Sequence, residues 1–374
     1  MNLLTFIPDF MRSAAAFVVV LGVLVFVHEL GHYLAARWRG VRVEAFSIGF
    51  GHALASWTDR HGTVWKLAWL PLGGYVKLHG QERPQDVADD VRAAWVPGQT
   101  FHDKPVLSRA IIVAAGPVAN FLLAMVLFAA LFIAIGTPVA LPVIGAVLPD
   151  SAAARAGLIV NDRVVAIANT PIATFEELQR VITLHPAQTL AMTIQRDGAD
   201  RQIEVTTDSR ESGGRQVGLL GVRGGAVEYR HTSVPAALLG GVTQTWAITR
   251  ETFTGLAQMI GGGRGTEELG GPLRIAQLSG QVAQLGIASL VSFIAVLSVN
   301  LGLINLFPIP ILDGGHLLFY LAEALRGRPL PQRAQEYGFK AGMAFLACLF
   351  VFATWNDLSH LGLFRWVASL IGPA

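Results

Sequence analysis

Four long stretches of the chain are almost entirely apolar, and each is long enough to cross a lipid bilayer as a helix. They run from Met11 to Trp38, Ala110 to Ile135, Ala288 to Phe307 and Gly338 to Trp355. A hydrocarbon core about 30 Å thick needs about 20 such residues in helical form. Four crossings would place both chain ends on the same side. The pattern therefore predicts a multi-pass α-helical membrane protein.

Basic residues next to these stretches predict their orientation. They follow the first span, precede the second, and fill the connection between the third and fourth: Arg37, Arg39, Arg42, Lys104, Arg109, Arg326, Arg328, Arg333 and Lys340. Short loops rich in Lys and Arg stay in the cytoplasm, so we expect region 136–287 to be extracytoplasmic, which in a bacterium is the periplasm. The first span lacks the basic start and cleavage site of a signal peptide, so we expect it to remain in the mature protein.

After the second span the pattern changes to short alternating runs separated by Pro, Asn, Asp and Gly. Such runs predict strands, for example at Arg163–Ile167 and Leu190–Ile194. A helix is expected over Thr174–Leu184, because Thr174 can cap it and Phe175, Leu178, Val181 and Ile182 form an apolar face. The order of these elements over 136–225 resembles a PDZ domain, and a generic small β domain is the alternative. Residues 226–287 follow an amphipathic helical pattern.

Composition agrees with a membrane protein. Hydrophobic residues make up 52% of the chain and charged residues 14%, against about 25% charged in soluble domains. A formal net charge of +2 and the absence of a long basic run argue against a nucleic-acid partner. The single cysteine, Cys348, excludes a disulfide framework, and we interpret it as a packing residue.

The first span contains a sequence that predicts metal chemistry, His28-Glu29-Leu30-Gly31-His32. Positions four apart share one helix face, so both imidazoles can reach one ion, and Glu29 lies beside them. With this spacing the metal lowers the pKa of a bound water and the glutamate takes its proton. Ionisable residues are costly within a membrane helix, about 2.5–3.5 kcal/mol on insertion scales, which favours a catalytic site over a solvated face.

Catalytic zinc sites use three protein ligands, and the end of the third span offers a candidate for the third. Asp313 lies in Asn305–Gly315, where two prolines and two glycines break the helix. Irregular backbone at membrane depth is tolerated only where it is buried in protein or lines a water-filled cavity. The segment therefore predicts a polar cavity that contains a carboxylate.

Taken together, these motifs resemble the site-2 protease family and its bacterial branch, the regulator-of-sigma-E proteases. The resemblance rests on His28 to His32, on the Asn305 to Gly315 pattern N-x-x-P-x-P-x-L-D-G-G, on Gly116-Pro117-Val118-Ala119-Asn120 and on the PDZ-like insert. They occur in the family's order and cover nearly the whole chain. One departure is that some members carry two PDZ domains, whereas we expect one here.

The resemblance implies that His28, His32 and Asp313 bind Zn²⁺, that Glu29 is the general base, and that Asn305 holds the substrate backbone. It also implies that Phe46–Lys77 dips into the membrane as β-hairpins, so that an edge near Gly49 and Gly51 binds an unwound substrate by strand addition. An ordinary cytoplasmic hairpin is the alternative. His316, directly after the glycines, is either a neighbour of the site or a structural residue.

With these implications, the expected fold class is a multi-pass α-helical membrane protein of about four transmembrane helices, with a membrane-associated β-hairpin region and one PDZ-like α+β domain. The expected parts are helix 1 at 1–38, a cytoplasmic-side region with β-hairpins at 39–109, helix 2 at 110–135, the periplasmic PDZ-like domain at 136–225, a periplasmic amphipathic region at 226–287, helix 3 at 288–316, a cytoplasmic loop at 317–337, and helix 4 with a tail at 338–374.

The expected function is regulated intramembrane proteolysis in the bacterial inner membrane. The resemblance implies substrates that are single-pass membrane proteins, such as anti-sigma factors and remnant signal peptides, and an upstream site-1-type protease that trims them first. A zinc transporter would predict repeated halves and ionisable residues along several spans, whereas here they gather in the first and third. A non-catalytic PDZ scaffold is the other alternative, and the intact Glu29 argues against it.

Overall fold

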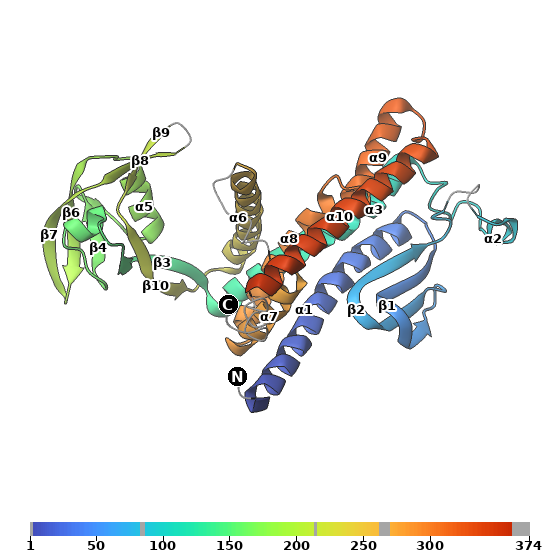
Figure 1. Ribbon diagram of the computed structural model, residues 1–374, viewed down its shortest axis with the longest axis horizontal. Helices are drawn as coiled ribbons and strands as arrows, with labels where there is room; N and C mark the ends of the chain where they lie inside the picture. The colour runs from blue at the N-terminus through green and yellow to red at the C-terminus, as the bar shows by residue number, and fades with distance from the viewer. Residues whose placement is uncertain (1–2, 83–86, 213–214, 262–269, 361–374) are drawn as a thin grey trace, which may run out of the picture. The chain divides into compact units, whose positions relative to one another are not determined.

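The computed structural model describes residues 3–82, 87–212, 215–261 and 270–360, and its contacts divide the chain into two compact units. One unit joins Met1–Leu131 with Leu238–Ala374, and the other is Phe132–Ala237. Figure 1 shows the helices and strands of both units, coloured along the chain from the N-terminus to the C-terminus. The first unit is mainly helical and the second mainly strands.

Four helices of the first unit are long and apolar enough to cross a membrane, as the sequence predicts. They are α1 (Leu3–Trp38), α3 (Val106–Ile135), α8 (Ile287–Leu306) and α10 (Gln332–His360), with candidate spans at Phe10–Trp38, Val106–Ile135, Ile287–Leu306 and Gln332–Ser359. Buried Val20 and Leu24 of α1 pack against Ile294 of α8 and against leucines of α3. Apolar contacts thus hold the first three spans together.

A twisted sheet of β1 (Val43–Thr58) and β2 (Val64–Leu78) lies against α1 (Figure 1). Phe46 pairs with both Val76 and Trp65, so the first half of β1 lies between two segments of β2. The segment Gly74–Leu78 therefore forms an edge of the sheet. Phe46 is fully buried in a cluster with Tyr33 of α1 and Ile112 of α3, which fixes the sheet to the helices.

Asp59 closes the turn between β1 and β2. Its carboxylate accepts hydrogen bonds from the Tyr33 hydroxyl, the Trp65 indole and the backbone N–H groups of His61 and Thr63, at 2.8 to 3.1 Å. Burial alone would raise the pKa of Asp59, but these hydrogen bonds overcome that effect and lower it to about 2. The ionised Asp59 thus ties the turn to α1.

The unit also contains α2 (Asp89–Ala93), α7 (Pro272–Gln284), α9 (Asp313–Arg326) and, from Leu238 on, α6 (Val234–Ile260). The side chain of Asp357 in α10 is buried and accepts hydrogen bonds from the N–H groups of Gly271 and Arg274. A carboxylate satisfies the free donors at a helix N-terminus. It thereby joins α10 to α7.

The expected loop at 317–337 is wrong for most of its length, because α9 covers it as far as Arg326 and α10 begins at Gln332. Residues 313–326 form α9, because the proline-containing break ends α8 at Leu306 and a new helix begins at Asp313. The acidic side chain of Asp313 stabilises the first turn of the helix, because the helix dipole makes that end positive. Gly327, in the left-handed conformation (φ 68°), ends the helix.

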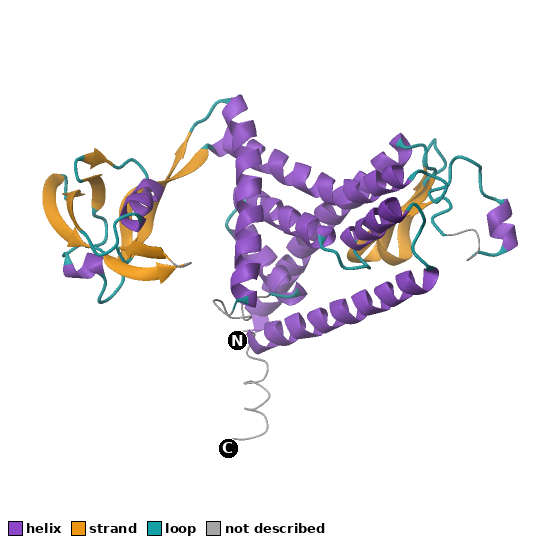
Figure 2. Cartoon of the chain, turned by 90° about the horizontal axis from the view of Figure 1, so that it is seen from above, coloured by secondary structure: helices purple, strands orange, loops and turns teal. Residues whose placement is uncertain are grey.

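The second unit is an α+β domain. Its main sheet has the strand order β10-β3-β4-β6-β7, with β5 beside β4. The bounds are β3 (Thr137–Val147), α4 (Ala152–Arg155), β4 (Arg163–Ile167), β5 (Thr170–Pro171), α5 (Phe175–Thr183), β6 (Thr189–Arg196), β7 (Ala199–Thr206), β8 (Asp208–Ser212), β9 (Arg215–Leu219) and β10 (Val222–Arg230). Figure 2 separates its strands and helices by colour.

Local sequence signals explain α5. The Thr174 side chain accepts from the N–H of Glu177, and the Glu177 side chain accepts from the N–H of Thr174, a reciprocal capping box. Phe175, Leu178 and Ile182 are buried in the core of the domain, so the predicted helix and its apolar face are confirmed. The expected boundary at 225 is too early, because β10 pairs with β3 as far as Arg230.

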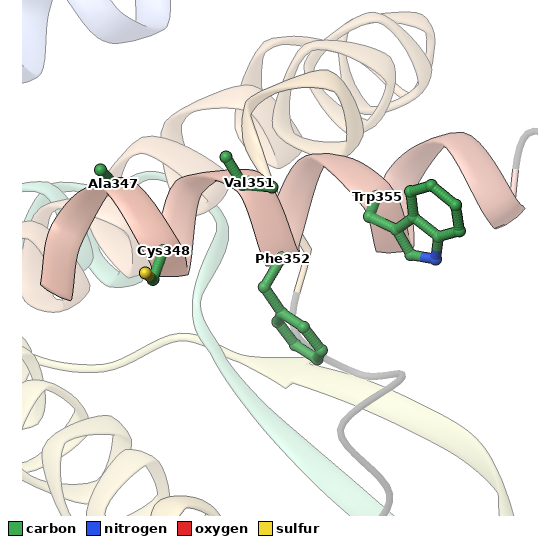
Figure 3. Close-up of a pocket in the computed structure, with 5 residues that line it drawn as sticks. All are labelled: Ala347, Cys348, Val351, Phe352 and Trp355. Atoms are coloured by element: carbon green, nitrogen blue, oxygen red, sulfur yellow. The ribbon is translucent and has the colours of Figure 1, made fainter. Parts of the chain in front are cut away.

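The interpretation of Cys348 as a packing residue is wrong, because Cys348 does not lie in the interior. Its side chain is exposed on α10, and Figure 3 shows it on the helix surface with Val351, Phe352 and Trp355. A span that packs little against the rest of its unit leaves apolar side chains on its surface, where lipid surrounds them. The thiol belongs to that apolar surface.

Candidate metal centre

Three side chains from distant parts of the chain converge in the helical unit. Asp313 Oδ2, in the first turn of α9, lies 3.2 Å from His28 Nε2 and 3.5 Å from His32 Nε2. The two Nε2 atoms are 3.2 Å apart. The helical spacing of four residues puts both imidazoles on one face of α1. The break after α8 brings the carboxylate to that face.

This donor set fits zinc. A tetrahedral zinc ion with metal–ligand distances of about 2.0–2.1 Å separates its ligands by about 3.3 Å, close to the three observed separations. Asp313 Oδ2 is buried and has no hydrogen-bond partner among the described residues, although buried polar atoms normally have one. Two imidazoles and a carboxylate are a common ligand set for catalytic zinc. The three residues form a cluster able to hold a metal ion.

Small residues let α1 and α3 approach closely enough to build the centre. A Cβ atom at Gly31 would lie 2.3 Å from the Ala115 carbonyl oxygen, and one at Gly116 would lie 2.2 Å from His32 Nε2. Real Cβ contacts do not occur at such distances, so a larger residue at either position would displace its neighbours. Small residues are the usual means by which membrane helices approach each other. Here they bring α3 against the two histidines.

The other ring nitrogen of each histidine faces α3. His32 Nδ1 lies 2.9 Å from the Ile112 carbonyl oxygen, and His28 Nδ1 lies 3.2 Å from Asn120 Nδ2. Asn120 is fully buried, and Ser298 of α8 donates a hydrogen bond to its backbone oxygen. Such partners orient the imidazoles of metal sites.

Helix α9, which carries Asp313 at its start, is held by the loop that precedes it and by an ion pair farther along the helix. A Cβ at Gly314 would lie 2.3 Å from the carbonyl oxygens of Leu306 and Phe307, so the loop folds tightly onto the end of α8. Farther along α9, Glu323 forms a two-pronged ion pair with Arg109 of α3, at 2.7 and 3.2 Å. Both side chains are largely buried. The pair ties α9 to the helix that faces the histidines.

A cavity of about 730 Å³ surrounds the centre. Its walls include the metal-site cluster, Glu29, Asn305, His316 and the sheet edge at Gly74–Val76, and they extend to Arg109 and Glu323. A Cβ at Gly74 would lie 3.0 Å from Glu29 Cγ and 2.7 Å from the Ser47 carbonyl oxygen. The sheet edge thus runs directly beside the Glu29 side chain.

Most of the residues singled out from the sequence lie in this cavity. His28, His32 and Asp313 meet, and Glu29, Asn305 and His316 line the walls. Gly49 and Gly51 are not among the lining residues; Gly51 instead packs under the Trp69 ring. Asn120 and Gly116 had no assigned role in the sequence. Their spacing of four residues, which places both on one helix face, was the available signal.

Comparisons with known proteins agree with this geometry. The model of peptidase family M50 matches residues 16–349. A Rhizobium meliloti protein named as a zinc metalloprotease is 45% identical, covering 92% of this chain and 96% of its own. The regulator of sigma-E protease RseP of Salmonella typhimurium is 33% identical, covering 93% of this chain and 99% of its own. The PDZ domain of an SdrC-like protein from Listeria monocytogenes is 16% identical, covering 21% of this chain and 82% of its own, with a TM-score of 0.19.

The chain belongs to peptidase family M50, the family of the site-2 proteases, as its motifs predict. It is a zinc metalloprotease with four candidate membrane-spanning helices. Family membership favours this function over a zinc transporter or a non-catalytic scaffold.

Proposed function

We propose that this protein is an intramembrane zinc endopeptidase that cuts single-pass membrane proteins within or near their transmembrane segments, in the bacterial inner membrane. The observation that carries the proposal is the convergence of His28, His32 and Asp313 within one cavity that Glu29 also lines. Two of these ligands lie on an apolar helix long enough to span a bilayer. Peptide bonds within the membrane segment of a substrate would be able to reach a metal site on this helix.

In this proposal His28, His32 and Asp313 hold the zinc. Bound zinc would polarise a peptide carbonyl and make water acidic enough to react near neutral pH. Glu29 would act as the general base, since its carboxylate lies in the cavity one residue from His28. The cavity wall at Gly74 limits where that side chain can move.

The substrate would bind as an extended strand. The edge at Gly74–Leu78 lies in the cavity wall beside Glu29, and a strand edge offers unpaired N–H and C=O groups to a peptide. Asn305 lines the same cavity and would hold the substrate backbone. The amide nitrogen of Asn305 donates to the Leu301 carbonyl oxygen, which would leave its amide oxygen as an acceptor for the substrate backbone. Gly49 and Gly51 were expected to bind the substrate, but they are not among the residues that line the cavity. In this proposal they would instead shape the strand that supports the edge.

Strand binding requires the substrate helix to unwind. A substrate whose membrane segment contains Gly, Pro or Asn should therefore be cut faster than one of polyleucine, because a regular helix hides its carbonyl groups. Equal rates would remove the strand-addition step from the proposal.

The α+β unit would lie in the periplasm and control access. It would exclude substrates with bulky periplasmic parts until a site-1-type protease has trimmed them. Replacing residues 142–207 with a short flexible linker should make a full-length substrate cleavable while leaving a trimmed one cleavable. Loss of all cleavage in a folded variant with zinc would assign the unit to catalysis instead.

The direct test of the function uses Glu29→Gln, with Glu336→Gln on the surface of α10 as the matched control. Cleavage of a model transmembrane substrate should fall by about 10²- to 10⁴-fold in the Glu29 variant, the usual contribution of a general base. Zinc content should stay the same in both variants. Undiminished cleavage by Glu29→Gln would refute the assigned mechanism.

A further inference from the structure

His28 has close neighbours at both ring nitrogens. Nε2 faces His32 Nε2 and Asp313 Oδ2, each at 3.2 Å. Nδ1 faces the side-chain nitrogen of Asn120, also at 3.2 Å. Asn120 is fully buried, and its side-chain oxygen has no hydrogen-bond partner among the described residues.

The orientation of the Asn120 amide decides where the imidazole proton of His28 lies. When the amide nitrogen faces His28, Nδ1 accepts and the ring proton must lie on Nε2. A neutral imidazole binds a metal through its unprotonated nitrogen. In this arrangement the nitrogen that points at the metal site is the protonated one.

His32 has the opposite arrangement. The Ile112 carbonyl oxygen, 2.9 Å from His32 Nδ1, can only accept, so the proton lies on Nδ1 and Nε2 is free for a metal. His28 needs the same kind of acceptor at Nδ1 before it can bind zinc through Nε2. The Asn120 side-chain oxygen, which has no partner among the described residues, is the candidate.

We infer that Asn120 is a positioning residue that selects the metal-binding tautomer of His28. A rotation of its side-chain amide by about 180° exchanges oxygen and nitrogen in nearly the same space. The oxygen then accepts a hydrogen bond from His28 Nδ1–H, and the ring proton has moved from Nε2 to Nδ1 with no change in total charge. Zinc binding and the amide rotation are therefore coupled. This inference rests on the proposed function, because it concerns the same zinc site.

Zinc affinity of the purified full chain, measured by competition with a chelator, tests the coupling. Asn120→Leu keeps the approximate shape but removes the acceptor, and it should bind zinc about 10- to 100-fold more weakly, the usual effect of losing such a partner. Asn120→Asp keeps an acceptor and has no donor, so it should bind zinc at least as tightly as the wild type. Glu336→Gln on the exposed surface of α10 is the control and should leave the affinity unchanged.

Comparing Asn120→Asp with Asn120→Leu separates a tautomer effect from a packing effect. Both variants change the same buried position, but only Asp keeps an acceptor. Cobalt absorption spectra should show a tetrahedral site in the wild type and in Asn120→Asp, with saturation at higher cobalt concentration in Asn120→Leu. Wild-type zinc affinity in Asn120→Leu, or equal weakening in the Leu and Asp variants, would overturn the inference. A wild-type chain that binds no zinc would instead contradict the proposed function.

Discussion

Gly116 of α3 lies against His32 of α1 so closely that a Cβ atom at position 116 would fall 2.2 Å from His32 Nε2. The same atom would lie 2.9 Å from His28 Cε1. Both distances are shorter than any stable contact between these atoms. One glycine therefore sets the space that the two imidazoles occupy.

Gly116→Ala should accordingly displace the imidazoles and lower both zinc content and cleavage. Because 1 Å of misplacement can cost about 10²-fold in rate, we expect at least a tenfold loss of activity. Gly22→Ala on α1 is the matched control, since its Cβ would meet nothing within 4 Å. Full zinc content and activity in Gly116→Ala would contradict this account of the packing.

Gly74→Ala should affect the rate without affecting the metal. The added Cβ would press on Glu29 Cγ at 3.0 Å and on the Ser47 carbonyl oxygen at 2.7 Å, whereas His28 and His32 are not among its nearest atoms. We expect a lower kcat with unchanged zinc content. Gly224→Ala in β10, whose Cβ would make only ordinary contacts at 3.6 Å or more, controls for the loss of a strand glycine. A normal kcat in Gly74→Ala would separate the sheet edge from Glu29.

The ion pair between Arg109 and Glu323 should show strong coupling. Both side chains are largely buried, at 16% and 15% exposed, so removing one leaves the other charge without its partner in a largely buried position. Glu323→Leu alone should lower the free energy of unfolding by about 3–5 kcal/mol. The double variant Arg109→Leu with Glu323→Leu should be more stable than that single variant. Additive losses in denaturant unfolding would show that the pair contributes little.

The sequence predicted those elements whose signals are local. The four spans follow from apolar length, and α5 follows from Thr174 with the spacing of Phe175, Leu178 and Ile182. The motif at His28 to His32 and the broken segment around Asp313 were likewise visible along the chain. Each of these signals comes from the residues of a single helix or loop.

Features that depend on contacts between helices could not be predicted from the sequence. The role of Asn120 depends on α3 crossing α1 at Gly31 and Gly116, and no local pattern gives that crossing. Helix α9 was missed because its start is set by the fold of the preceding loop onto α8. The exposure of Cys348 depends on which face of α10 packs against its neighbours.

In the second unit the buried Asp162 should give a stability that depends on pH. It accepts two hydrogen bonds from the Arg196 side chain at 2.7 Å and one from the Ile159 N–H at 2.9 Å. Burial opposes ionisation, yet these bonds hold the pKa of Asp162 below its usual value. The stabilisation is therefore complete above the unfolded pKa of about 3.9 and is lost as the pH falls through the lower folded pKa.

Asp162→Asn tests this sign directly. At neutral pH the variant should unfold at a lower temperature than the wild type, with the difference read from hydrogen exchange of Phe132–Ala237 in the full chain. The difference should shrink as the pH falls below about 4. A difference that stays constant down to pH 2 would mean that ionisation of Asp162 does not contribute.

The central claim, that α9 supplies the third zinc ligand, is tested most directly by counting zinc per chain in Asp313→Ala. We expect one zinc per chain in the purified wild type. In a folded Asp313→Ala variant we expect loss of zinc during dialysis against a chelator that leaves the wild type loaded, because two histidines alone are one ligand short of a catalytic site. An Asp313→Ala chain that keeps one zinc through the same dialysis would contradict the account.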